Sequence, residues 1–119
     1  MSDDNVLSPT ILANNRRDMK NRGGINWLID LLLEEIPNYV SELQQAITTG
    51  DSETLVLAAH KFKGSCSNVG AISMMDFCKQ LEKLGRTGDM EKAAIIMAND
   101  LAQEVECLIK ALEREKQQN

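Results

Sequence analysis

Apolar residues recur at spacings of three and four along most of this 119-residue chain, and this periodicity restricts its fold more than any other feature. Such spacing places apolar side chains on one face of an α-helix. No segment shows the alternation of apolar and polar residues that is typical of a strand. A helix expected at about 26–48 has an apolar stripe that consists of Leu28, Leu32, Ile36, Val40, Leu43 and Ile47. A helix expected at about 89–115 has a second stripe, which consists of Met90, Ala94, Met97, Leu101, Val105, Leu108 and Leu112.

Pro37 lies inside the first stripe. An interior proline removes a backbone hydrogen bond and costs about 3 kcal/mol in a helix. We therefore expect a kink near residues 34–37, or two helices that meet there.

Two nearly identical segments, "TGDSE" at 49–53 and "TGDME" at 87–91, mark the corners between helices. In each, a glycine suits the end of one helix and an aspartate suits the N-cap of the next. These corners separate helices expected at about 52–68, 71–86 and 89–115, with a break at "NVGA". The sequence thus predicts an all-α fold, an up-and-down antiparallel four-helix bundle.

The N-terminal part adds a further short helix to this prediction. Ser8 and Pro9 suit an N-cap and a first helical position, and Gly23 and Gly24 suit a stop. We expect a disordered tail over 1–8, a short helix at about 9–20, and one domain over 9–117.

Charge and cysteine content exclude several functions. The formal net charge of −5 does not suit a nucleic-acid-binding protein. Three widely spaced cysteines indicate reduced thiols, and neither a signal peptide nor a membrane span is visible. A cytoplasmic protein without membrane or nucleic-acid partners is therefore expected. The single histidine and scattered cysteines give no metal-ligand spacing, so no metal site is predicted.

The single histidine, His60, projects from the outer face of its helix. On a helical wheel with Leu55 at zero, His60 lies at about 140° and Gly64 at about 180°. A glycine on an exposed helical face costs up to ~1 kcal/mol relative to alanine. A partner that approaches the imidazole needs room, which would explain the glycine at this position. The residues expected to contact the partner on this face are Val56, Leu57, Lys61 and Ser67.

The histidine lies in the one basic segment of an acidic chain. From His60 to Gly88 there are five basic and two acidic residues, a balance of +3 that leaves −8 for the remainder. A neutral imidazole has a free lone pair that can attack phosphorus. Lys63, one turn away, can offset the charge of phosphoryl oxygens. Nucleophile, cation and missing side chain therefore favour phosphoryl transfer with the help of a partner.

The segment "AHKFKGSCSNVGA" resembles the motif of histidine-containing phosphotransfer (HPt) domains: Ala59-His60, then Lys63-Gly64-Ser65, then Gly70-Ala71. The stretch "CKQLEKLGRTGD" that follows is also similar, and the resemblance covers about 25–113. It implies a four-helix bundle in which His60 accepts the phosphoryl group, Lys63 stabilises its charge and Gly64 gives clearance. It also implies that a side chain of the next helix supports the other ring nitrogen. Glu82 matches best by spacing, with Gln80 as the neighbouring candidate.

The resemblance further implies receiver domains of response regulators and a hybrid sensor histidine kinase as partners. The chain would be a monomeric phosphocarrier and no enzyme by itself. It would have no cofactor of its own, and the Mg²⁺ would be bound by the partner receiver, which would supply much of the catalysis. Two alternatives remain: a helical adaptor that binds receivers or kinases without being phosphorylated, and an oligomerisation module built on the 89–115 helix.

Overall fold

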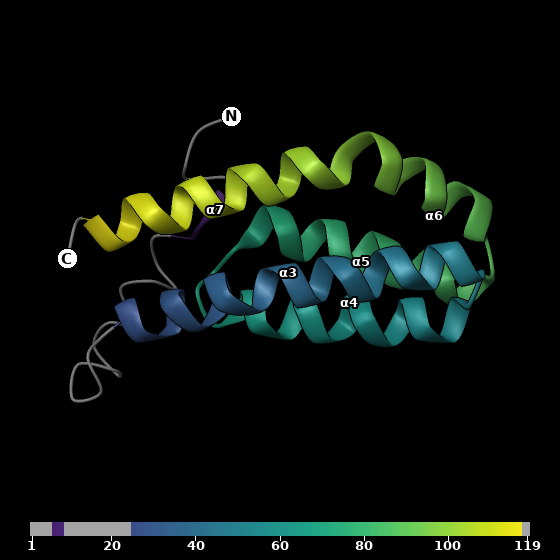
Figure 1. Ribbon diagram of the computed structural model, residues 1–119, viewed down its shortest axis with the longest axis horizontal. Coiled ribbons are helices and arrows are strands. Elements are labelled where there is room, and N and C mark those ends of the chain that lie inside the picture. The colour runs from purple at the N-terminus through teal and green to yellow at the C-terminus, as the bar shows by residue number, and fades with distance from the viewer. Residues whose placement is uncertain (1–5, 9–24, 118–119) are drawn as a thin grey trace.

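The structure, a computed structural model, describes residues 6–8 and 25–117. No strand occurs among these residues, and helices account for nearly all of them. In Figure 1 the C-terminal part of the chain forms a long helical rod that runs along one side of the other helices. In chain order the elements are α3 (Ile25–Thr49), α4 (Ser52–Ser67), α5 (Ile72–Thr87), and a rod made of α6 (Met90–Ile96), the π-helical turn η2 (Met97–Leu101) and α7 (Ala102–Gln117).

The helices close into a four-helix bundle. Helix α4 packs against α3 on one side and α5 on the other, and the rod contacts both α3 and α5. Tight corners join the successive helices, which run antiparallel (Figure 1). The predicted all-α bundle is thus confirmed for the described residues, whereas the short helix expected at 9–20 lies outside them. The largest fully buried side chains are Phe62, Ile25, Ile29, Ile36, Leu43, Leu55, Met74, Leu81, Leu108, Leu112, Glu82 and Val69.

Both predicted corners have the same backbone hydrogen bonds. At the first, the amide of Gly50 donates to the carbonyl of Ile47 and that of Asp51 to the carbonyl of Ala46. At the second, Gly88 and Asp89 repeat this pattern toward the end of α5. Gly50 and Gly88 have φ angles of 69° and 78°, which favour glycine. The repeated pentapeptide therefore encodes one corner geometry twice.

Pro37 does not divide the first helix, because α3 continues without interruption from Ile25 to Thr49. The prediction of two helices meeting there is wrong. Pro37 is exposed, and the buried side chains on either side of it belong to one core, so packing outweighs the lost hydrogen bond. These side chains are Ile25, Ile29, Leu32, Ile36, Tyr39, Leu43 and Ala46.

The helix expected at 89–115 contains a π turn at Met97–Leu101. Ala93, Met97, Leu101 and Val105 follow one another at spacings of four, which exceed the 3.6 residues of an α-helical turn. A π turn holds more residues per turn, so it keeps these side chains on the bundle side. Ala93, Met97 and Leu101 are all buried.

Residues 6–8 differ from the tail expected over 1–8. Val6 and Leu7 are buried and belong to the core. The amide of Ser8 donates to the carbonyl of Gly70 at 2.6 Å, which holds this segment at the α4–α5 turn. Within the described residues, no helix is long and apolar enough to cross a membrane.

Candidate functional site

Helix α4 holds His60 on its outer face. The helix begins at an N-cap, where Asp51 accepts a hydrogen bond from the amide of Thr54 at 3.1 Å. Its core side consists of Leu55, Ala58, Ala59, Phe62 and Cys66, all buried. The His60 side chain is 66% exposed. The orientation predicted from the helical wheel is therefore present in the fold.

A buried carboxylate lies beneath the histidine. Glu82 of α5 is only 2% exposed, and three side chains converge on it. Its Oε2 lies 3.4 Å from Nδ1 of His60 and 3.0 Å from a guanidinium nitrogen of Arg86. Its Oε1 lies 2.5 Å from Nζ of Lys63. We call these four residues the Glu82 cluster.

The cluster keeps Glu82 ionised. Burial raises the pKa of the Glu82 carboxyl group, but the close ion pair with Lys63, with smaller effects of His60, outweighs burial and holds the pKa below its ordinary value. A carboxylate accepts hydrogen bonds and donates none. When the imidazole is neutral, its hydrogen therefore belongs on Nδ1, and the lone pair of Nε2 lies on the opposite edge of the ring.

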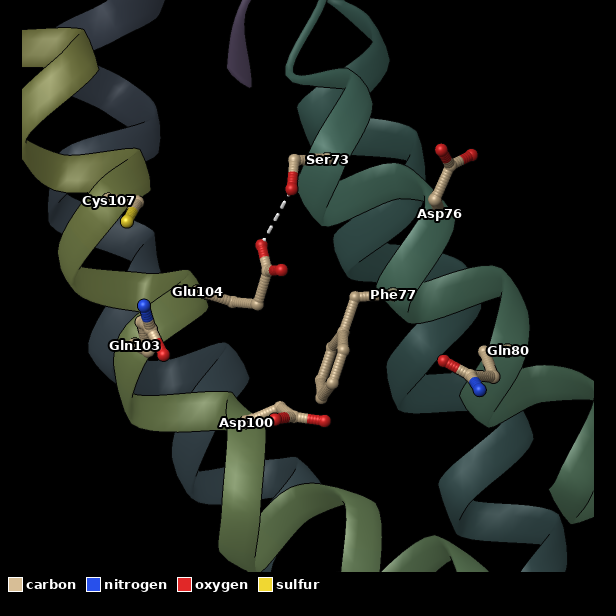
Figure 2. A pocket seen from close by; sticks show the side chains of 8 residues that line it. All are labelled: Ser73, Asp76, Phe77, Gln80, Asp100, Gln103, Glu104 and Cys107. Atoms are coloured by element: carbon tan, nitrogen blue, oxygen red, sulfur yellow. Dashed lines mark hydrogen bonds between the residues drawn. The ribbon is translucent and has the colours of Figure 1, made fainter. Parts of the chain in front are cut away.

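Gln80, the other candidate for supporting His60, also lines the groove beside Lys63 and Glu82, but within the described residues the ring of His60 is hydrogen-bonded to Glu82 and not to Gln80. Figure 2 shows Gln80 at a recess between α5 and the η2–α7 part of the rod, where a hydrogen bond of 2.8 Å joins Ser73 to Glu104. This recess has a volume of 340 Å³. Of the two candidates, only Glu82 has its side chain beside His60.

Lys63 and Gly64 follow His60 on α4 by three and four residues, and Lys63 also contacts Glu82 of α5. Lys63 is only 27% exposed because its ammonium group is bound to Glu82. Gly64 is exposed, and a Cβ built on it would have no neighbouring atom within 4 Å. The missing side chain at Gly64 is therefore not required by packing inside the protein.

The expected partner-binding residues have different surroundings. Leu57 is 66% exposed, whereas Val56 is half-buried and packs against Gly85 of α5. The ammonium group of Lys61 lies 3.2 Å from a carboxylate oxygen of Glu42 on α3. The hydroxyl group of Ser67 donates to the carbonyl of Gly64 at 2.6 Å. Leu57 is thus the side chain of this set that offers the most free apolar surface.

Arg86 was not predicted to be a member of the site. In the sequence it is only one of the five basic residues between His60 and Gly88. Glu82 and Arg86 are four residues apart in one helix, a spacing that brings opposite charges together. That spacing was the available signal. Arg86 also lines a groove of 550 Å³ with Lys63, Lys79 and Lys83, so the predicted basic patch lies beside the Glu82 cluster.

The described residues contain no group of three or more histidine, cysteine, aspartate or glutamate side chains that could hold a metal ion. What the site offers is one exposed nitrogen nucleophile, one buried carboxylate and nearby cations. Phosphoryl transfer requires mainly positioning and charge compensation. The arrangement suits the acceptance of a phosphoryl group from a partner that brings the rest.

Comparisons with known proteins agree with this chemistry. The Hpt domain family model matches residues 28–118. Among solved structures, the chain is similar to the crystal structure of histidine-containing phosphotransfer protein B (HptB) from Pseudomonas aeruginosa PAO1. The two chains are 26% identical, the match covers 95% of this chain and 96% of that chain, and the TM-score is 0.85. Comparison with curated proteins gives no match.

The family match extends over most of the chain and includes the His60 motif and the Glu82 cluster. Members of this family are phosphocarriers rather than enzymes in the usual sense, and they work with receiver domains and histidine kinases in phosphorelays. The chain belongs to the Hpt domain family, and its function is histidine phosphotransfer in a phosphorelay.

Proposed function

We propose that His60 accepts a phosphoryl group from the aspartyl phosphate of one receiver domain and passes it to the aspartate of another. The observation that carries this proposal is the combination of a 66% exposed imidazole with a buried carboxylate at its Nδ1 atom. The carboxylate favours the tautomer with a hydrogen on Nδ1. Nε2 is then the nucleophile.

Transfer moves the phosphoryl group from the aspartate of the receiver to Nε2 of His60. The lone pair of Nε2 forms the N–P bond, the P–O bond to the receiver's aspartate breaks, and its electron pair returns to that carboxylate. The ring keeps its hydrogen on Nδ1 and becomes a phosphorylated imidazolium. Glu82 stabilises this positive ring, and its hydrogen bond at 3.4 Å has room to shorten in the transition state. The reverse sequence transfers the group to the second receiver.

Lys63 is the cation for the phosphoryl oxygens. Its ammonium group starts on Oε1 of Glu82, one helical turn from His60. A phosphoryl group with two negative charges attracts it more strongly than the single charge of a carboxylate does. Lys63 therefore turns from Glu82 toward the phosphoryl group, which stabilises the phosphohistidine.

The receiver docks on the outer face of α4. Gly64 leaves open space beside His60, and Leu57 supplies exposed apolar surface. Lys61, Ser67 and the accessible part of Val56 complete this face. The receiver binds the Mg²⁺ and provides most of the catalysis, and its acidic pocket is attracted by the basic segment. The phosphocarrier acts as a monomer in the cytoplasm and receives its phosphoryl group from a hybrid sensor kinase.

Phosphotransfer profiling against the receivers of the source organism tests the proposal. We expect at least one labelled receiver to transfer its label to the wild-type protein, and His60→Gln to abolish acceptance while the helix content stays the same. Label that persists in His60→Gln would refute the role of His60. No label on the wild type across the whole panel would favour the adaptor that binds without being phosphorylated.

Light scattering tests the monomer. A mass that corresponds to one chain at all concentrations is expected. A dimer that forms with increasing concentration would instead support an oligomerisation role for the rod formed by α6, η2 and α7.

A further inference from the structure

Arg86 contacts the same carboxylate oxygen as His60. Its guanidinium nitrogen lies 3.0 Å from Oε2 of Glu82, and Nδ1 of His60 lies 3.4 Å from that oxygen. Arg86 itself is 64% exposed, but the carboxylate that it reaches is 2% exposed. The pair therefore differs from an ordinary surface ion pair, because one partner is shielded from water.

Glu82 needs a cation that stays with it. A buried carboxylate that loses its charge partners is strongly unfavourable. In the structure Lys63 binds Oε1 and Arg86 binds Oε2. If Lys63 turns toward the phosphoryl group, Arg86 is the permanently charged side chain that still contacts Glu82, beside the phosphorylated ring of His60.

The two contacts are also directional. Because Lys63 and Arg86 bind different oxygens, they fix the rotation of the carboxylate and keep Oε2 toward Nδ1 of His60. Once Lys63 has left Oε1, the contacts of Oε2 with Arg86 and with the His60 ring oppose rotation of the carboxylate. The position of Arg86 is itself favourable, since a glutamate four residues before an arginine on a helix is a stabilising order.

We propose that Arg86 is a positioning residue for phosphotransfer: it neutralises Glu82 and holds its Oε2 against Nδ1 of His60 while Lys63 serves the phosphoryl group. This proposal rests on the proposed function. It assigns Arg86 a role that depends on the glutamate at position 82. A glutamine there would accept the Nδ1 hydrogen with a neutral amide and would need no cation.

The dependence on Glu82 distinguishes a positioning role of Arg86 from a direct role in docking the receiver. An exposed arginine could also contact an acidic receiver directly, and its removal would then weaken transfer whatever residue is at position 82. If Arg86 acts through Glu82, its effect disappears when the carboxylate is replaced. A double-mutant cycle over the two residues measures this coupling.

The cycle compares transfer rates, at saturating phosphorylated receiver, of wild type, Arg86→Met, Glu82→Gln and the double variant. We expect Arg86→Met to slow transfer by on the order of tenfold in the wild-type background, and by less than about twofold with Gln at position 82. Arg86→Lys should recover part of the rate because it keeps the charge. An equal slowing in both backgrounds, or no slowing in either, would overturn the proposal.

Lys83→Met is the matched control. Lys83 is exposed, lines the same groove as Arg86, and among the described residues forms no ion pair or hydrogen bond with the Glu82 side chain. Its replacement removes one positive charge from the groove. Any effect of Lys83→Met should therefore be the same with Glu or Gln at position 82.

A second measurement needs no phosphorylation. His60 is the only histidine, so its ring nitrogens give unambiguous ¹⁵N signals that report the tautomer of the neutral ring. The Nδ1–H form should predominate in the wild type, and the Nε2–H share should increase in Arg86→Met but not in Lys83→Met. An unchanged tautomer ratio in Arg86→Met would overturn the proposal. If no receiver labels the wild type, the proposed function fails, and this spectrum still decides the role of Arg86.

Discussion

Val56 of α4 lies so close to Gly85 of α5 that a Cβ atom at Gly85 would be 2.7 Å from Cγ2 of Val56. The same Cβ would be 3.1 Å from the backbone carbonyl oxygen of Ser52. The β-branched valine has little rotamer freedom in a helix, and the backbone of Ser52 cannot move alone. This contact fixes the distance between the helix that carries His60 and the helix that carries Glu82.

Gly85→Ala should therefore destabilise the protein. The gain in helix propensity is smaller than the cost of overpacking, which is about 1–3 kcal/mol. Urea unfolding followed by circular dichroism measures the change. A variant as stable as the wild type would show that α4 and α5 can separate without cost.

Gly64→Ala should have the opposite effect on stability and serves as the matched control. Both glycines lie inside helices, but a Cβ at Gly64 has no neighbour within 4 Å. Alanine should increase the free energy of unfolding by roughly 0.5–1 kcal/mol. Destabilisation on the same urea curves would mean that the exposed face of α4 is packed against something inside the protein.

A long side chain at Gly64 should reduce transfer rather than stability. Gly64→Gln fills the open space beside His60 on the face proposed for receiver docking. We expect slower transfer from a phosphorylated receiver, with Gly64→Ala in between, while unfolding by urea stays close to the wild type. Transfer by Gly64→Gln at the wild-type rate would contradict the role of Gly64 in clearance.

The parts of the fold that depend on local sequence were predictable. The "TGDSE" and "TGDME" corners form because glycine and aspartate act within a few residues of each other. The outward direction of His60 follows from helical geometry alone. The prediction of Glu82 came from the family resemblance, in which a residue about 22 positions after the histidine supports its ring. The distance of 3.4 Å between Nδ1 of His60 and Oε2 of Glu82 agrees with that prediction.

What could not be predicted depends on packing between distant residues. The continuity of α3 through Pro37 is a property of the whole core, since the local cost of proline argues against it. The burial of Val6 and Leu7 requires a site that the α4–α5 turn provides. Arg86 was visible as a charge four residues after Glu82, but its importance appears only once Glu82 is known to be buried.

Chemical labelling should distinguish the cysteines. Burial raises the pKa of the Cys78 thiol to about 12, with a smaller contribution from Glu82, and burial also raises the pKa of Cys66. Cys107 is partly exposed. The thiolate is the reactive form, so an alkylating reagent at about pH 8 should modify Cys107 alone in the folded protein.

Mass spectrometry counts the added groups. For the wild type, one added group is expected in native buffer and three in urea. For Cys107→Ser, no added group is expected in native buffer and two in urea. Rapid modification of Cys66 or Cys78 in native buffer would contradict their burial between α4 and α5.

The contribution of Glu82 to stability should depend on pH. Burial raises the pKa of its carboxyl group, but Lys63 and His60 together lower it below the ordinary 4.5. A group with a lowered pKa in the folded state stabilises the fold above its unfolded pKa, and this stabilisation is lost as the pH falls through the folded pKa. The stability of the wild type relative to Glu82→Gln should therefore decrease as the pH falls from about 5 toward about 3. Urea unfolding of both proteins at each pH gives this difference, in which the other carboxyl groups cancel.

In a Lys63→Met background the decrease should be smaller, because the strongest cause of the lowered pKa is gone. A difference that is the same at all these pH values would show that Glu82 gains no charge stabilisation from the cluster.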